Sequence, residues 1–208
     1  MKNRQRRTPN PMLGKRFLRA FEYALRKHRN QPRKGKDVPY MEHLMGVCSI
    51  ALHYGATEDE AMAALLHDVV EDCGGEPVLK EVRRKFGPRV AAIVEGCTDD
   101  MTGHQTPWEF RKERYIEHLR STRDNGACLV SAADKLHNSR AILADYRDIG
   151  MKVWDRFSRP ADKTLWYYRE LLKAFRARRR DRRVSLLVDE LERVVHALHR
   201  KVGITEAQ

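Results

Sequence analysis

The chain has 208 residues, 41% of them hydrophobic, and a formal net charge of +12. This length supports one domain with a sizeable core and leaves little room for a second domain of ordinary size. The positive charge favours an anionic partner, whether a phosphorylated small molecule, a nucleic acid or an acidic membrane surface. Because no apolar run is long enough for a signal peptide or a membrane span, we expect a cytoplasmic protein without a membrane partner.

Residues 1–11 are basic and contain two prolines, so we expect a flexible tail there. A single domain is expected over residues 12–201, followed by a short C-terminal tail over 202–208. The four cysteines are scattered singly and form no Cys-x-x-Cys pair, which argues against a zinc knuckle or a dithiol motif. We expect them to be reduced and mostly buried.

Helical spacing of apolar residues recurs along most of the chain, and glycines, prolines and a capping box at Thr57 and Glu60 mark the boundaries. Two loops interrupt it: residues 31–40, which contain three cations, and the polar connection 98–107. No alternating strand pattern and no repeat is present, so the fold is predicted to be all-α and compact. Helices are expected over residues 13–28, 40–54, 57–73, 77–86, 88–96, 107–121, 127–146 and 183–201, with one more around 165–175.

The stretch Leu65 to Asp72 has the most informative pattern. On a helix its four apolar residues fall on one side, and His67, Asp68, Glu71 and Asp72 fall on the other. A solvated acidic face is the alternative interpretation. A His-Asp pair in the middle of that face favours a functional site, because Lys or Arg would be the ordinary partners for acids.

Residues of the metal-ligand type occur on three separated elements. A set of two imidazoles and two carboxylates suits manganese, iron or zinc better than calcium or magnesium. If these side chains converge, the ion lowers the pKa of a bound water, and Glu71 and Asp72 could orient or deprotonate that water. The candidate ligands are His43, His67, Asp68 and Asp134.

Six segments of the chain resemble, in order, the hydrolase domain of RelA/SpoT-type alarmone enzymes, within the HD phosphohydrolase superfamily. The resemblance covers about residues 13–198 and is strongest to the small stand-alone hydrolases, which include the metazoan SpoT homologue. The segments are Arg33-Lys-Gly, Pro39-Tyr-Met-Glu-His43, Leu65-Leu-His-Asp-Val-Val-Glu-Asp72, Phe86-Gly, Thr98-Asp-Asp and Ala133-Asp-Lys-Leu-His-Asn138.

The resemblance implies an HD-domain bundle of about eight to ten helices that holds one Mn²⁺, with other divalent transition metals also open. In that family a metal-activated water attacks the 3′-pyrophosphate of (p)ppGpp and releases pyrophosphate with GDP or GTP. The implied ligands are the four candidates above, and Glu71 and Asp72 match the catalytic acidic pair. Arg33 and Lys34 match cations near the nucleotide, and Asn138 matches a residue near the sugar.

The chain departs from the family pattern at three positions. Leu44 stands where a proline is usual, which affects the entry to a helix more than the ligand beside it. Ser131 and Met101 stand where lysines are frequent. These two missing cations leave other substrates open, namely ppApp and the 2′-phosphate of NADPH.

A rival from another class is a basic helical protein that binds nucleic acid through its net charge and the run Arg178 to Arg183. Nucleic acid is the less favoured partner, because nonspecific binding needs no His-Asp constellation and no aromatic stacking platform is apparent. A regulatory pseudoenzyme is disfavoured because every matched metal and acidic position is present. A homo-oligomer stays open. The aromatic residues Trp108, Trp154, Trp166, Tyr167 and Tyr168 are expected to pack or to border loops. His137 is assigned no metal role because it lies on an apolar-leaning side of its helix.

Overall fold

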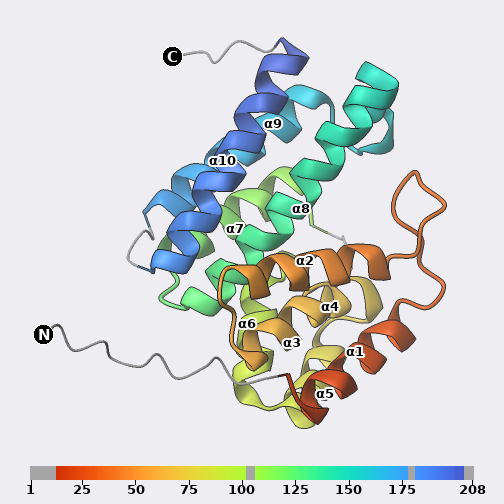
Figure 1. The fold of residues 1–208 in the computed structure, drawn as a ribbon, viewed down its shortest axis with the longest axis vertical. Helices are drawn as coiled ribbons and strands as arrows, with labels where there is room; N and C mark the ends of the chain where they lie inside the picture. Colours follow the sequence, from red (N-terminus) through yellow and green to blue (C-terminus); the bar gives the residue numbers. More distant parts are fainter. Residues whose placement is uncertain (1–12, 102–105, 178–180, 204–208) are drawn as a thin grey trace, which may run out of the picture.

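The computed structural model describes residues 13–101, 106–177 and 181–203. Within these ranges the chain forms ten α-helices and one 3-10 helix (Figure 1). The described residues contain no β-strand, and their only isolated bridge pairs Pro32 with Pro39 at the base of the basic loop, which spans residues 31–40. The all-α prediction is therefore confirmed.

The first half of the chain forms a group of six helices that lie together at one end of the molecule (Figure 1). They contribute apolar residues to the core, and among these Val47 on the second helix and Val94 on the sixth are fully buried. Prolines and glycines at the helix boundaries keep the connections short. The helices are α1 (Lys15–Lys27), α2 (Met41–His53), α3 (Glu58–Leu66), α4 (Val69–Cys73), α5 (Glu76–Phe86) and α6 (Pro88–Cys97).

Helix α8 connects the two halves of the fold. It packs against α2, α3 and α6 on the N-terminal side and against α9 and α10 on the other, within one continuous core. Its polar residue Asp134 therefore lies where the two halves meet. The elements of the second half are α7 (Trp108–Ser121), α8 (Asn125–Ile149), the 3-10 helix η1 (Gly150–Arg156), α9 (Ala161–Arg176) and α10 (Arg182–Val202).

The single helix predicted over residues 57–73 is wrong, because the chain turns between α3 and α4. His67 and Asp68 occupy this turn, and Asp68 has φ −97° and ψ −7°. The ring of His67 reaches back to the carbonyl of Ala64, and Asp68 accepts a hydrogen bond from Tyr40. Neighbouring residues of a regular helix point about 100° apart. The turn instead lets His67 and Asp68 approach the same point.

Other expectations meet mixed outcomes. Phe110 is 57% exposed, although apolar spacing on the helix predicted over residues 107–121 indicates that it faces inward, whereas the neighbouring Arg111 is buried. The four cysteines are free, and Cys48 and Cys128 are buried. Among the described helices, none combines the length and apolar character that crossing a bilayer requires. Part of the basic run from Arg178 to Arg183 lies outside the described residues.

The predicted capping box at the start of α3 is present and is extended by a contact with α10. The backbone N–H of Thr57 donates to Glu60 Oε2 at 2.7 Å, and Thr57 Oγ1 accepts from the backbone N–H of Glu60. Arg183 donates to both carboxylate oxygens of Glu60, at 2.8 and 3.2 Å. Since Glu60 is only 4% exposed, Arg183 provides most of its charge compensation and ties α10 to α3.

Replacing Arg183 with Met should lower the free energy of unfolding by about 2 kcal/mol, because the carboxylate of Glu60 stays buried without its guanidinium partner. Urea denaturation followed by circular dichroism measures this loss. Arg193→Met is the matched control on the same helix: Arg193 pairs with Glu190 at the exposed surface, and its loss should leave the midpoint unchanged. Equal midpoints for the two variants would contradict this account of the α3–α10 contact.

Candidate metal centre

Three elements bring the four candidate metal ligands together. His43 comes from α2, His67 and Asp68 come from the turn between α3 and α4, and Asp134 comes from α8. The Nε2 atoms of the two histidines are 3.3 Å apart. Asp134 Oδ1 is 3.2 Å from His43 Nε2 and 3.7 Å from His67 Nε2. Asp68 Oδ2 is 3.0 Å from His67 Nε2 and 3.5 Å from His43 Nε2.

This donor set fits a divalent transition metal. Ligand atoms about 2.1 Å from one ion lie roughly 3 Å apart when they occupy adjacent positions around it. The distances from 3.0 to 3.7 Å between the imidazole and carboxylate atoms match that spacing. His43, His67 and Asp134 each offer one ligand atom, and these three atoms all lie within 4.8 Å of one another. All three residues are buried.

Contacts behind the ligands fix their orientation. His67 Nδ1 lies 2.9 Å from the carbonyl oxygen of Ala64, so its N–H donates there and Nε2 is left as the metal-facing nitrogen. Tyr40 donates its hydroxyl to Asp68 Oδ2 at 2.6 Å. Lys135 Nζ donates to Asp134 Oδ2 at 2.6 Å, which leaves Oδ1 toward the histidines.

The electrostatics of the centre favour a bound cation. Burial opposes the charged forms, but the attraction between the groups is stronger. Asp68 and Asp134 hold the pKa of His67 well above its usual value. The charge and hydrogen bonds of His67 and His43 hold the pKa of Asp68 well below the usual range. The pKa of Asp134 is also held well below the usual range, mainly by the charge of Lys135. The two carboxylates therefore favour a positive charge beside them, which a bound metal ion would supply.

The predicted acidic pair does not share one surface. Asp72 lines a cleft beside the centre and accepts a hydrogen bond from Gln31 at 2.8 Å. Burial and then the nearby charge of Asp68 raise the pKa of Asp72. Glu71 instead approaches Arg111 at 3.7 Å, and burial together with Asp99 raises its pKa to about 9.

A buried ion network stands behind Glu71. Asp99 accepts a hydrogen bond from Arg111 at 3.0 Å and pairs with Lys112. Only the family resemblance pointed to the Thr98-Asp-Asp segment, and no sequence pattern pointed to Arg111 and Lys112. Their cationic side chains are ordinary on a charged helix, so the sequence gives no signal that they face inward.

The cleft next to the four ligands has a volume of about 1200 Å³, which is large enough for a nucleotide-sized ligand. It opens between the basic loop, α2, α8 and the segment from η1 into α9. The predicted substrate residues Arg33, Lys34 and Asn138 all line it, and Arg33 donates to Asn138 Oδ1 at 2.9 Å. Lys112 and Lys135 add two cations to its wall.

Aromatic side chains also border this cleft, in addition to the packing role that was expected for them. Trp108, Tyr167 and Tyr168 line it. Trp108 and Tyr167 contact each other edge to face, with ring centroids 6.0 Å apart. They are half-buried or buried, so they form part of the core and one wall of the cleft at once.

His137 is the functional candidate that sequence reasoning missed. It lines the cleft, and its Nδ1 lies 3.0 Å from Nδ1 of His43. The available signals were its i,i+3 spacing from Asp134 and the presence of Gly46, a poor helix former, inside α2. Neither signal alone distinguishes a cleft-facing histidine from a packed one.

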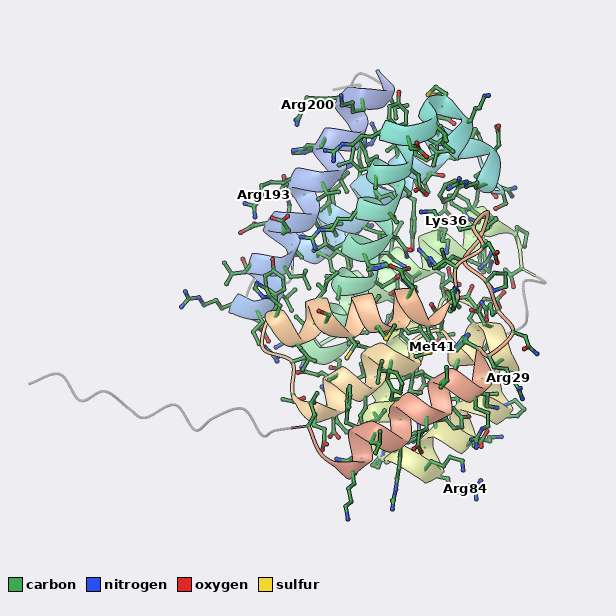
Figure 2. The ribbon with its side chains drawn as sticks, turned by 45° about the vertical axis from the view of Figure 1, so that its right-hand side comes forward. Arg29, Lys36, Met41, Arg84, Arg193 and Arg200 are labelled. Carbon is green, nitrogen blue, oxygen red and sulfur yellow. The ribbon has the colours of Figure 1, made fainter. Side chains whose placement is uncertain are left out.

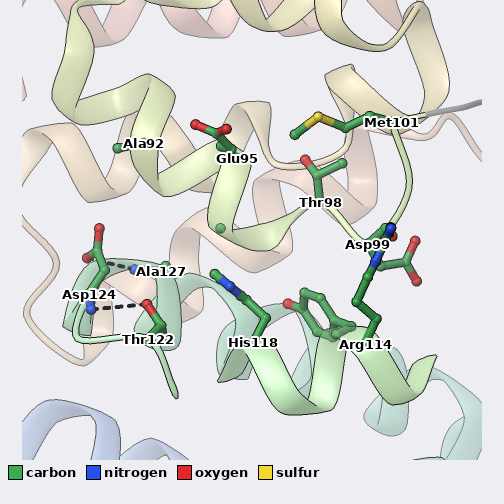
Figure 3. A pocket seen from close by; sticks show the side chains of 12 residues that line it. Ala92, Glu95, Thr98, Asp99, Met101, Arg114, His118, Thr122, Asp124 and Ala127 are labelled. Atoms are coloured by element: carbon green, nitrogen blue, oxygen red, sulfur yellow. Dashed lines mark hydrogen bonds between the residues drawn. The ribbon is translucent and has the colours of Figure 1, made fainter. Parts of the chain in front are cut away.

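A second pocket of about 530 Å³ lies between α6, α7 and the start of α8 (Figure 3). Its acids are committed to local structure. Asp124 caps α8 through the backbone N–H groups of Gly126 and Ala127, and Glu95 pairs with Arg83 at the surface. Arg114 donates to the backbone carbonyl of Asp99 at 2.8 Å. The cleft beside the four ligands is therefore the stronger candidate site.

Comparison with known proteins identifies the family. The family model described as "HD domain" matches residues 20–160, and the chain belongs to this family. It is thus a metal-dependent phosphohydrolase. A human relative, guanosine-3′,5′-bis(diphosphate) 3′-pyrophosphohydrolase MESH1, is 42% identical over 127 residues, which cover 60% of this chain and 68% of the relative.

Two solved structures share the fold. One belongs to a metazoan orthologue of SpoT, described as hydrolysing ppGpp and acting in starvation responses. It has a TM-score of 0.70 and 28% identity, and the match covers 91% of this chain and 97% of that one. The other is lmo0812 from Listeria monocytogenes EGD-e, with a TM-score of 0.68, 30% identity and coverage of 76% and 99%.

Metal binding should release about one proton for each Mn²⁺ at pH 7, because the ion must displace the proton that the carboxylates hold on His67. Calorimetric titration of the metal-free protein in two buffers of different ionisation enthalpy measures this number. The pKa of His67 is raised, so affinity should increase as pH rises through that pKa. Binding without proton release, or affinity that falls with rising pH over this range, would contradict the charge assignment.

Proposed function

We propose that the protein hydrolyses the 3′-pyrophosphate of (p)ppGpp-type alarmones with one Mn²⁺, giving pyrophosphate and GDP or GTP. The observation that supports this most is the convergence of His43, His67, Asp68 and Asp134 beside a cleft with several cations. The activity named for the human relative points to the same reaction. A nucleotide substrate of this kind is consistent with action in the cytoplasm.

A divalent ion bound by these four side chains supplies Lewis-acid chemistry: it acidifies water and offsets the negative charge of a phosphoryl group. The protein orients the ligands through Tyr40, Lys135 and the carbonyl of Ala64. This fixed arrangement reduces the reorganisation that the reaction needs.

The cleft cations recognise the phosphate groups. Lys135 and Lys112 each pair with one buried carboxylate, Asp134 and Asp99 respectively, and both line the cleft. Lys34 lines the cleft mouth, and the structure gives it no ion pair with a described residue. Polyphosphate carries several negative charges on compact oxygens, and such charges favour a cationic wall.

The acidic pair takes two different roles. A water molecule attacks phosphorus while the bond from phosphorus to the 3′ oxygen breaks. Asp72, which lines the cleft, accepts the proton of the water, and the 3′ oxygen that leaves takes up a proton from solvent. Glu71 is not among the residues that line the cleft, and it acts on the site through its contact with Arg111 and the nearby charge of Asp99.

The lysine that the sequence lacks at position 131 is less important than it first seems. Ser131 is buried behind Tyr115, whose hydroxyl lies 2.7 Å from the Ser131 hydroxyl, so position 131 contributes no side chain to the cleft wall. Lys112 supplies a cation to the cleft from α7. We therefore retain the guanosine alarmone as the leading substrate, with ppApp and the 2′-phosphate of NADPH as alternatives.

The alternative of nucleic-acid binding has weaker support. Figure 2 places Arg193 and Arg200 on α10, Arg29 after α1 and Arg84 on α5, so positive charge is spread over distant parts of the molecule. A single basic stripe would be the usual footprint for a nucleic acid. Within the basic run, Arg183 forms an internal ion pair with Glu60.

Purified protein with Mn²⁺ should release pyrophosphate from ppGpp faster than from ppApp, and faster than it releases phosphate from NADPH. Asp68→Ala should abolish both turnover and bound manganese, because one ligand and the pairing of His67 are lost together. Ion chromatography of the products and metal analysis of the protein measure the two effects.

Asp148→Ala is the matched control, because Asp148 lies exposed at the end of α8. This variant should keep wild-type turnover and metal content. No turnover of any of the three substrates by the manganese-loaded wild-type protein would overturn the proposed function. Full activity of Asp68→Ala would remove Asp68 from the ligand set, and preferred release from ppApp or NADPH would replace the guanosine assignment.

A further inference from the structure

The ligand His43 is buried, with a relative exposure of 1%, and both of its ring nitrogens have partners. Nε2 faces Asp134, Asp68 and the other histidine of the centre. Nδ1 faces Nδ1 of His137 at 3.0 Å. A neutral imidazole that offers Nε2 to a metal carries its proton on Nδ1. The geometry therefore makes His43 Nδ1–H a donor to His137.

This assignment fixes the tautomer of His137. Its Nδ1 must accept, so its proton lies on Nε2. That nitrogen is 3.3 Å from Oε1 of Glu42, whose carboxylate can accept the N–H. A hydrogen-bonded chain thus runs from Glu42 through His137 to His43. The second histidine ligand is held differently, because His67 donates to the backbone carbonyl of Ala64.

Helix α2 leaves space for the ring of His137. A Cβ atom at Gly46 would lie 2.2 Å from Nε2 and 2.3 Å from Cδ2 of His137. Glycine inside a helix costs about 1 kcal/mol relative to alanine, so this residue weakens α2. Its absence of a side chain allows the His137 ring to lie against the helix, between Glu42 and His43.

We propose that His137 is a positioning residue of the metal centre. The chain Glu42–His137–His43 sets the tautomer and the ring orientation of His43, and Gly46 provides the space that this chain needs. The inference rests on the proposed metal site, because His43 must bind the ion through Nε2. Partners behind a metal ligand typically change metal affinity or activity by about 10- to 100-fold when they are removed.

Four variants of the 208-residue chain test this role. His137→Leu removes the acceptor, whereas His137→Asn keeps an amide oxygen near the place of Nδ1. Glu42→Gln removes the carboxylate at the end of the hydrogen-bonded chain, and Gly46→Ala displaces the His137 ring without changing it. His53→Leu is the matched control, since His53 is an exposed histidine on α2, the helix that also carries Glu42 and Gly46. The probe is Mn²⁺ alone, and its dissociation constant is measured by competition with a chelator.

His137→Leu and Gly46→Ala should weaken Mn²⁺ binding by about 10- to 100-fold. His137→Asn should recover most of this loss, Glu42→Gln should fall between the wild type and His137→Leu, and His53→Leu should match the wild type. The visible absorption of bound Co²⁺ should change in His137→Leu and stay near the wild-type spectrum in His137→Asn. Thermal midpoints of the metal-free proteins separate these effects from a loss of stability.

Wild-type affinity in His137→Leu would overturn the proposal. An equal loss in His137→Leu and His137→Asn, with a parallel drop of the metal-free midpoint, would also overturn it, because that pattern marks a packing role. Absence of Mn²⁺ binding to the wild-type protein is a distinct outcome, since it would remove the metal site on which the proposed function depends and the positioning role with it.

Discussion

The convergence of two imidazoles and two carboxylates at one point, three of them buried, is the constraint on which the rest of the structure depends. Uncompensated charge in a protein interior is costly, so such a cluster persists only where a proton or a cation balances it. His67 and Asp68 reach this point together because the chain turns between α3 and α4. Asp134 reaches it because α8 runs between the two halves of the fold. The architecture therefore serves to bring distant donors into one small volume.

Contacts from the start of α2 and from α8 hold three of the four ligands. Asp68 is fixed by Tyr40 from the start of α2, and Asp134 is fixed by Lys135 from its own helix. His43 is fixed by His137 from α8. These contacts reach outward to the cleft, where the same elements present cations and aromatic rings. Substrate binding and metal positioning thus share one set of helices, and substitutions in the cleft wall can change both.

The sequence predicted much of this arrangement, and its failures have physical causes. Helix boundaries and the capping box followed from local residues, so the all-α class could be predicted. The turn at His67 could not, because the surrounding leucines and valines keep a helical period through it. Convergence with Asp134 depends on packing between helices, which periodicity does not contain. The pattern of α8 alone could not predict the role of His137, because the space for its ring beside His43 comes from Gly46 in another helix. The four ligands were identified through their residue types and a family resemblance, and their roles stay a proposal.

The most direct test of the central claim is a crystal structure of the Mn²⁺-loaded protein with anomalous data collected at the manganese absorption edge. The account predicts one anomalous peak for each chain, in contact with His43, His67, Asp68 and Asp134. A peak bound by other side chains, or no peak in crystals of protein that contains manganese, would contradict the metal centre.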